Sequence, residues 1–169
     1  MPELLIGSGN RCEKAFGGQF TAVTTLDLDP TAKPDVVWDL NRLPLPFDND
    51  VFDEVHAIDV LEHLGRQGDW RQWFAMFDEF YRILKPSGTF QCLAPRFDSV
   101  WAMGDPGHTR IITEQQLFYL HRPAYAQVGS TPMTNYMPYF TSDWDLTHRE
   151  YLDHHLAFIL TAIKPARSA

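Results

Sequence analysis

The chain has 169 residues, 44% of them hydrophobic and 14% aromatic, which predicts one domain (residues 1–169) whose core needs no metal or disulfide support. Its net charge of −8, without runs of Lys or Arg, argues against a nucleic-acid substrate. No stretch of about 18 apolar residues occurs, the N-terminus lacks the pattern of a secretion signal, and the cysteines are Cys12 and Cys92. We therefore expect a cytoplasmic protein with no membrane span and with two buried, free thiols.

The N-terminal part of the chain contains four strand-like runs that end in glycines or acids. Residues 3–9 form an apolar strand followed by a tight Gly-Ser-Gly turn, and the next runs end at 25–29, 36–40 and 58–63. In a parallel α/β sheet the carboxyl ends of the strands line one crevice, where ligands bind. Glycine lets backbone N–H groups approach a ligand, and a nearby carboxylate can hold ribose hydroxyls. The pattern predicts a nucleoside-binding site.

Two helices are predicted in the first half of the chain. Residues 10–18 are a short candidate that ends at two glycines. Residues 69–84 are a stronger candidate, because Asp69 can cap the N-terminus and aromatic residues recur at three- and four-residue steps. This spacing predicts that the aromatic face packs against the sheet, followed by a buried strand at 89–94.

The C-terminal half alternates regular and irregular segments. Residues 113–121 predict a helix with Thr113 and Gln116 as a capping box. Residues 122–144 contain three prolines and many aromatic residues without a steady period. This segment is either a lid over the substrate or a loop packed on the sheet or on a second subunit. Residues 145–164 predict two strands, and the histidines at 148, 154 and 155 are interpreted as surface or structural residues.

These motifs resemble the class I S-adenosylmethionine-dependent methyltransferases, in the small branch that carries Leu-Glu-His-Leu at 61–64. Residues 7–9 match the glycine loop, Asp27 matches the acid that holds the ribose diol, and residues 39–40 match the pair that reads adenine. Further matches lie at 43–47 and 82–88, so the resemblance covers roughly residues 3–120. It implies cofactor binding by Gly7, Ser8, Gly9, Asp27, Leu28, Asp39, Leu40 and Asp59.

The resemblance also implies a fold. We expect a doubly wound, Rossmann-like and mostly parallel seven-stranded sheet with an antiparallel C-terminal hairpin. The family usually has helices before the first strand, whereas here strand residues begin almost at Met1. We therefore expect a reduced N-terminus. Either the site is more open than usual, or residues 122–144, together with the partner chain of a homodimer, supply the missing wall.

Other interpretations of the glycine loop remain open. A dinucleotide-binding domain needs a third glycine, where this chain has Cys12, and assigns no role to Asp39 or residues 61–63. Glycines after a strand can also form a turn without a ligand. A non-catalytic interaction module with the same fold is the main alternative to an enzyme.

The segment after the fourth strand carries the candidate catalytic groups. His63 and His108 are candidate general bases, since histidine titrates near neutral pH. The spacing of Asp59 from Glu62 and His63 resembles the metal motif of the small-RNA 2′-O-methyltransferases and ubiquinone-pathway O-methyltransferases. Asp59, Glu62, His63 and His108 are thus a candidate site for Mg²⁺, Mn²⁺ or Zn²⁺. The competing interpretation is a cofactor contact by Asp59, a turn cap by Glu62 and a structural hydrogen bond by His63.

The sequence therefore predicts methyl transfer from S-adenosyl-L-methionine to a small-molecule or glycan acceptor, with a divalent metal as a candidate second cofactor.

Overall fold

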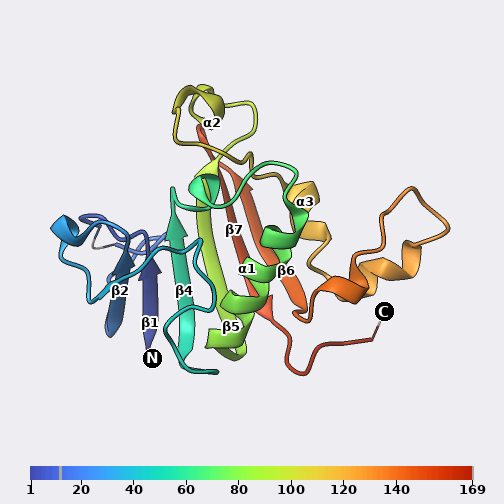
Figure 1. Ribbon diagram of the computed structural model, residues 1–169, viewed down its shortest axis with the longest axis horizontal. Coiled ribbons are helices and arrows are strands. Elements are labelled where there is room, and N and C mark those ends of the chain that lie inside the picture. Colours follow the sequence, from blue (N-terminus) through green and yellow to red (C-terminus); the bar gives the residue numbers. More distant parts are fainter. Residues whose placement is uncertain (12, 169) are drawn as a thin grey trace.

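The computed structural model describes residues 1–11 and 13–168. Its centre is a seven-stranded sheet in the order β3-β2-β1-β4-β5-β7-β6 (Figure 1). The strands are β1 (Glu3–Ile6), β2 (Val23–Asp27), β3 (Val36–Val37), β4 (Phe52–Ile58), β5 (Leu84–Pro95), β6 (Trp144–Tyr151) and β7 (His155–Ala162). The pairs among β1 to β5 are parallel, and β7 runs antiparallel to both β5 and β6. The predicted fold, including the C-terminal hairpin, is confirmed.

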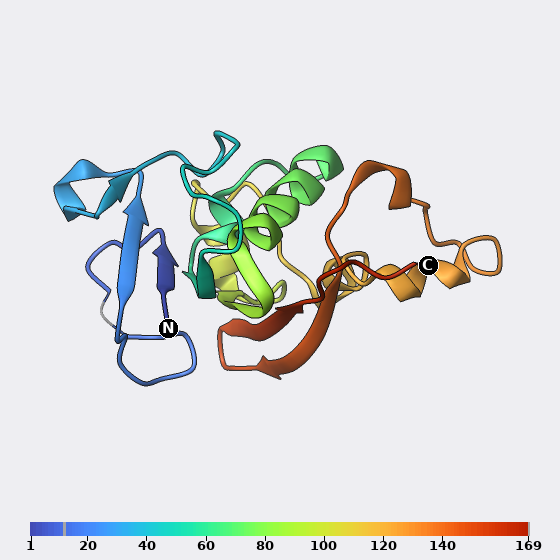
Figure 2. The ribbon, with the colours of Figure 1, turned by 90° about the horizontal axis from the view of Figure 1, so that it is seen from below.

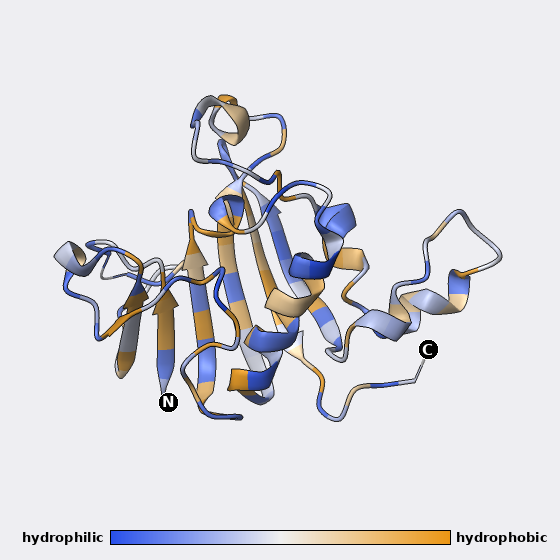
Figure 3. Ribbon diagram, in the orientation of Figure 1, coloured by the Kyte–Doolittle hydropathy of each residue, from blue (hydrophilic) through white to orange (hydrophobic). Residues whose placement is uncertain are grey.

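The helix α1 (Trp70–Ile83) covers one face of the sheet (Figures 1 and 2). As predicted, Asp69 caps it, because the Gln72 N–H donates to Asp69 Oδ1 over 3.1 Å. Its aromatic stripe packs inward: Phe77 and Phe80 are almost fully buried and contact the ring of Phe90 on β5. Figure 3 shows hydrophobic and hydrophilic bands along the strands, as expected when successive side chains point to opposite faces. This face holds the main core of the protein.

A loop rather than a helix contacts the opposite face. The prediction of a helix at 10–18 is wrong, since the described residues of this segment form turns and an isolated bridge between Glu13 and Gln19. The reason lies in contacts with other strands: the ammonium group of Lys14 is held against the sheet by Glu3 of β1 and Glu54 of β4, at 2.5 and 2.7 Å. Cys92 is free and buried as predicted, whereas the prediction for Cys12 lies outside the described residues.

Two short helices follow β5. The first, α2 (Val100–Gly104), lies beyond the carboxyl ends of the strands (Figure 1). The second, α3 (Glu114–Phe118), is shorter than predicted but has the full capping box between Thr113 and Gln116. In the described chain no helix is both long and apolar enough to cross a membrane.

The segment between α3 and β6 extends away from the sheet (Figures 1 and 2). Its only regular structure within the described residues is two 3-10 helices, η3 (Arg122–Gln127) and η4 (Met137–Tyr139). Its return to the sheet is held by Asp78 of α1, which accepts hydrogen bonds from the backbone of Thr141 and Ser142. The segment is otherwise irregular over its described residues.

Candidate active site

A cleft of about 320 Å³ lies at the carboxyl ends of β1, β2 and β4. It brings together most of the residues that the sequence indicates for the cofactor, although Ser8 and Gly9 do not line it. Its walls also include side chains that sequence reasoning missed, notably Trp38 and Asn41. Their position on either side of the Asp39-Leu40 pair was the available signal. The lining residues are Gly7, Asp27, Leu28, Trp38, Asp39, Leu40, Asn41, Asp59, Val60, His63 and Leu64.

The glycine loop is shaped by backbone geometry and by Asp27. Gly7 has φ +57°, and a Cβ at this position would lie 2.4 Å from Cγ2 of Val60. Only glycine fits there without movement. The Gly9 N–H donates to Asp27 Oδ2 and the Asp29 N–H donates to Asp27 Oδ1, both over 2.8 Å. Each carboxylate oxygen retains a lone pair, so Asp27 is fixed in place and can still accept hydrogen bonds from a ribose diol.

The other end of the cleft is held by a turn after β3. The Asn41 N–H donates to Asp39 Oδ1 over 2.9 Å, which forms a tight local turn. Asn41 Oδ1 in turn accepts hydrogen bonds from the Gly65 N–H and from the side chain of Gln72 on α1. Leu40 is buried and Trp38 is half-buried. Trp38 and Leu40 therefore offer an apolar surface next to the Asp39 carboxylate, on which a flat ring can pack.

Asp59 has an unusual backbone conformation and charged partners. Its φ is +54°, which side chains rarely adopt and which functional sites often retain. Its Oδ2 lies 2.5 Å from the guanidinium group of Arg11, and its Oδ1 lies 2.8 Å from Nε2 of His155. His155 starts β7, far away in the sequence, so the contact could not be read from local spacing. The structure therefore places Asp59 at the cleft with partners other than the metal candidates.

Three of the four predicted metal ligands do converge. Glu62, His63 and His108 have ligand atoms that all lie within 4.8 Å of one another, and Asp59 is not part of this group. The His108 Nε2 lies 4.0 Å from Glu62 Oε1, and the two histidine rings meet edge to face with centroids 4.6 Å apart. Throughout the described residues, neither carboxylate oxygen of Glu62 has a hydrogen-bond partner. Burial raises the pKa of Glu62 to about 7.

The backbone around this cluster fixes its geometry. The 3-10 helix η2 (Leu61–His63) follows β4, and the carbonyl of Glu62 accepts hydrogen bonds from the Thr109 and Arg110 N–H groups. His63 Nδ1 lies 3.1 Å from the Gly107 carbonyl oxygen. Because a carbonyl only accepts, Nδ1 carries the proton in neutral His63 and leaves Nε2 free as a base or ligand. Residues 61–63 and 107–110 thus form one unit.

Comparison with known proteins agrees with this geometry. A family model described as "Methyltransferase domain" matches residues 4–92. The chain therefore belongs to this methyltransferase domain family. The class I S-adenosylmethionine-dependent fold predicted from the motifs is confirmed. A search of curated proteins finds no match.

Solved structures support the same fold at low sequence identity. One similar chain comes from the structure described as the complex between the Haloferax volcanii Trm112 methyltransferase activator and the putative methyltransferase. It matches at 17% identity and a TM-score of 0.62, over 98% of this chain and 83% of that chain. A SAM-dependent methyltransferase from Archaeoglobus fulgidus matches at 15% identity and TM-score 0.57, over 95% of this chain and 85% of that one. A third structure is the Burkholderia thailandensis 1,6-didemethyltoxoflavin-N1-methyltransferase with bound 1,6-didemethyltoxoflavin and S-adenosylhomocysteine. It matches at 16% identity and a TM-score of 0.53, over 96% of this chain and 71% of that one.

Proposed function

We propose that this protein transfers the methyl group of S-adenosylmethionine to a small acceptor. The observation that supports it most is the cleft in which Gly7 of the glycine loop, Asp27 and the residue 38–41 turn face one cavity. When bound, the cofactor supplies an electrophilic methyl group on a sulfonium. In the reaction an acceptor lone pair forms a bond to the methyl carbon, the carbon–sulfur bond breaks, and its electron pair stays on sulfur. The protein mainly has to hold the two partners in line.

The residues of the cleft would divide the work of cofactor binding. Asp27 would accept hydrogen bonds from the ribose hydroxyls, and Asp39 would accept one from the adenine edge while Leu40 and Leu28 pack on the base. The backbone of Gly7, Ser8 and Gly9 would pass close to the amino-acid end of the cofactor, since glycine lets a chain approach a ligand. The Ser8 and Gly9 N–H groups hold the loop in shape by donating to the Leu26 carbonyl and to Asp27. The carboxylates of this cleft favour a cationic cofactor over an anionic dinucleotide.

His63 and His108 would act on the acceptor. If the methylated group is a hydroxyl or an amine, it must lose a proton, and a neutral imidazole next to the crevice can take it. His63 is the better candidate, because it lines the cleft and its Nδ1–H is bound to the Gly107 carbonyl, which leaves Nε2 unprotonated.

A divalent metal at Glu62, His63 and His108 is the alternative role that we propose for this cluster, since a His63 Nε2 that binds a metal cannot also take the proton of the acceptor. One carboxylate and two imidazoles suit Zn²⁺ or Mn²⁺ better than Mg²⁺, which prefers oxygen ligands. The unpartnered, buried carboxylate of Glu62 supports a cation, because a buried charge is costly without a partner. Metal analysis of protein purified without chelator, compared between wild type and His108→Ala, tests it: equal metal content in both would contradict the assignment.

Residues 122–144 are proposed as the wall on the acceptor side. The segment extends outward from the sheet, and Tyr136 within it packs against Trp70 of α1 with ring centroids 5.1 Å apart. A second copy of the chain could provide a wall instead. Size-exclusion chromatography with light scattering distinguishes these arrangements, since a self-sufficient wall is compatible with a monomer and a shared wall requires a dimer.

Cofactor titration by calorimetry tests the central proposal. We expect S-adenosylmethionine and S-adenosylhomocysteine to bind and NAD to bind much more weakly. Asp27→Ala removes hydrogen bonds from a charged group, which contribute on the order of 1.5–3 kcal/mol, so affinity should fall roughly ten- to a hundredfold. Asp48→Ala, at an acid outside the cleft, is the control. No heat with either methyl-cofactor form at millimolar concentration would favour the non-catalytic interaction module.

A further inference from the structure

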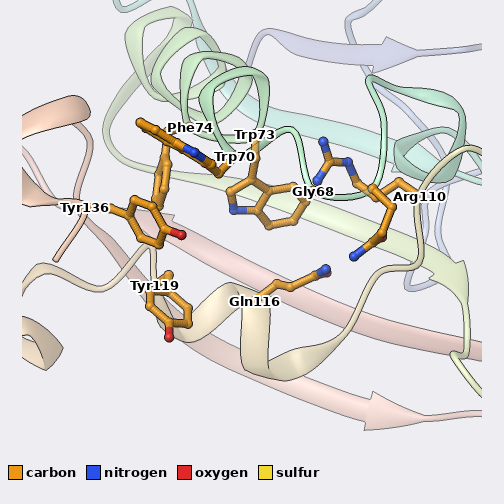
Figure 4. Close-up of a pocket in the computed structure, with 9 residues that line it drawn as sticks. Gly68, Trp70, Trp73, Phe74, Arg110, Gln116, Tyr119 and Tyr136 are labelled. Atoms are coloured by element: carbon orange, nitrogen blue, oxygen red, sulfur yellow. The ribbon is translucent and has the colours of Figure 1, made fainter. Parts of the chain in front are cut away.

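A second pocket, of about 250 Å³, lies between the N-terminus of α1, the start of α3 and the outward segment (Figure 4). It shares no residue with the cofactor cleft. Its walls are largely aromatic, and their flat surfaces suit a ring that can stack or meet them edge to face. The aromatic members are Trp70, Trp73, Phe74, Tyr119 and Tyr136.

The amide groups of this pocket are oriented by hydrogen bonds inside the fold, so that each has an NH₂ group available to donate to a ligand. The Oε1 of Gln67 accepts from the Ile111 N–H over 3.0 Å, and the Oε1 of Gln116 accepts from the Thr113 N–H over 3.0 Å. Because a backbone N–H is always a donor, these contacts fix which amide atom is oxygen. The NH₂ groups are left for a ligand, and that of Gln116 points into the space between the aromatic rings and Arg110 (Figure 4).

Arg110 is a buried cation without an anion. Arg110 is 4% exposed, and within the described residues its guanidinium donates to the backbone carbonyls of Leu64 and Asp69, at 3.2 and 3.1 Å. Among residues 1–11 and 13–168 it forms no ion pair, because the carboxylate of Asp69 caps α1 instead. Burial lowers the pKa of Arg110, as expected for a charge removed from water. A buried cation is costly unless its charge is paired. The Trp73 ring, whose centroid lies 5.1 Å from Cζ of Arg110, offsets part of that cost, and an anionic ligand would offset more of it.

We infer that this pocket binds a flat conjugated ring that carries a carboxylate or another anionic oxygen at one edge. The ring would lie among the aromatic side chains and the anion would face Arg110, with the two amide groups as additional donors. A sugar ring fits less well, because the walls are largely aromatic and the NH₂ and guanidinium groups of Gln67, Gln116 and Arg110 are donors, which favours an acceptor-rich anionic edge over hydroxyls.

Binding of such a ligand does not depend on the proposed function. The inference that this ligand is the methyl acceptor does rest on it. Residues 107–110 connect the two sites: the Arg110 N–H donates to the Glu62 carbonyl over 3.1 Å, and His108 belongs to the candidate catalytic cluster. A ligand held by Arg110 would therefore lie beside the segment that carries His108.

Direct binding of simple probes tests the pocket without any cofactor. We would titrate the full-length protein with 2-naphthoate, the neutral isostere 2-naphthamide and glucose, following line broadening of the ligand in NMR spectra. We expect 2-naphthoate to bind at least about tenfold more tightly than the amide, since a charge-assisted bond contributes more than a neutral one. Glucose should show no saturable binding.

Variants locate the binding. Trp70→Ala should weaken naphthoate binding at least about tenfold, whereas Trp101→Ala, at a 57% exposed tryptophan on α2, should leave it unchanged. Arg110→Met should abolish the preference for the acid over the amide. Because Arg110 also orders the loop at 64–69, Tyr136→Ala provides a second variant, which should weaken both probes equally and retain the preference.

Equal affinity for acid and amide, or binding that survives Trp70→Ala, would overturn the inference. Separate calorimetry with S-adenosylmethionine distinguishes the two failures. If naphthoate binds and the cofactor does not, the result supports the aromatic pocket and contradicts the proposed methyl transfer. If only the cofactor binds, the result supports cofactor binding and contradicts the aromatic pocket.

Discussion

The two faces of the sheet are stabilised in different ways. On the α1 face the strand side chains are apolar, and Val55, Phe90 and Leu160 lie side by side on adjacent strands. On the opposite face Glu54 lies next to both Glu3 and Thr89, while His56 lies next to Gln91. Packing therefore stabilises one face, and charged hydrogen bonds to a loop stabilise part of the other.

This difference explains how the fold is maintained with few helices. Burial of aromatic groups is non-directional and strong, so α1 can hold β4, β5 and β7 without special geometry. The loop at 10–22 has no apolar stripe and is instead oriented by specific bonds, including those from the Thr21 and Ala22 N–H groups to Glu3 Oε2. We expect mutations on the first face to cost stability at all pH values and those on the second face to show a pH dependence.

The largest expected effect is on the packed face. Phe77 is fully buried and its ring contacts those of Trp73, Phe80 and Phe90. Phe77→Ala should lower the free energy of unfolding by about 3–5 kcal/mol, through lost burial and the cavity left behind. Urea denaturation measures it, with Phe118→Ala as the control at a 44% exposed site. Similar small losses in both variants would contradict the assignment of this face as the main core.

Glu62, which follows β4, should destabilise the folded state when its carboxyl group is ionised. Its pKa is raised to about 7 by burial, so the folded state holds a proton that the unfolded state releases near pH 4.5. Stability therefore falls as the pH rises from 4.5 through 7. In EDTA, Glu62→Gln should stabilise the protein by about 2–3 kcal/mol at pH 8 and have little effect at pH 4. Glu150→Gln, at an exposed acid, should have no such pH dependence; the same flat profile in Glu62→Gln would refute the prediction.

Sequence periodicity predicted the packed face better than the polar face. The helix over 70–83 followed from aromatic spacing and a capping acid, because an amphipathic pattern and its burial have the same cause. The helix at 10–18 failed because the pull of Glu3 and Glu54 on Lys14 depends on strands remote in the sequence. Local propensity contains no information about such partners.

The candidate site was predicted unevenly for the same reason. The glycine loop and the acids at strand ends are local features, and the sequence located them. The pairing of Asp59 with His155, the burial of Glu62 and the isolation of Arg110 depend on segments that meet only in the fold. The aromatic pocket was missed because its residues come from separate segments, and the aromatic spacing over residues 69–84 predicted only packing against the sheet.

The glycine loop allows a matched pair of substitutions. Gly7→Ala would place a Cβ 2.4 Å from Val60, whereas a Cβ at Gly9 would have no neighbour within 4 Å. Both residues have positive φ, which costs an alanine roughly 1 kcal/mol. We expect Gly7→Ala to lose about 2 kcal/mol of stability and Gly9→Ala about 1 kcal/mol. Thermal unfolding with and without S-adenosylmethionine measures both; equal losses would mean that Val60 moves freely and that the loop is less constrained than its geometry indicates.

The smallest expected effect tests the charged face. Burial alone would raise the pKa of Glu3, but the Lys14 ammonium group and the Thr21 and Ala22 N–H groups outweigh it and lower the pKa to about 2. The stabilisation is therefore present above pH 4.5 and is lost as the pH falls toward 2. Glu3→Gln should cost about 1–2 kcal/mol at pH 6 and almost nothing near pH 2. Glu13→Gln, at an exposed acid on the same loop, should cost little at either pH. A loss in Glu3→Gln that is independent of pH would mean that shape rather than charge holds the loop, and the contrast between the two faces would then disappear.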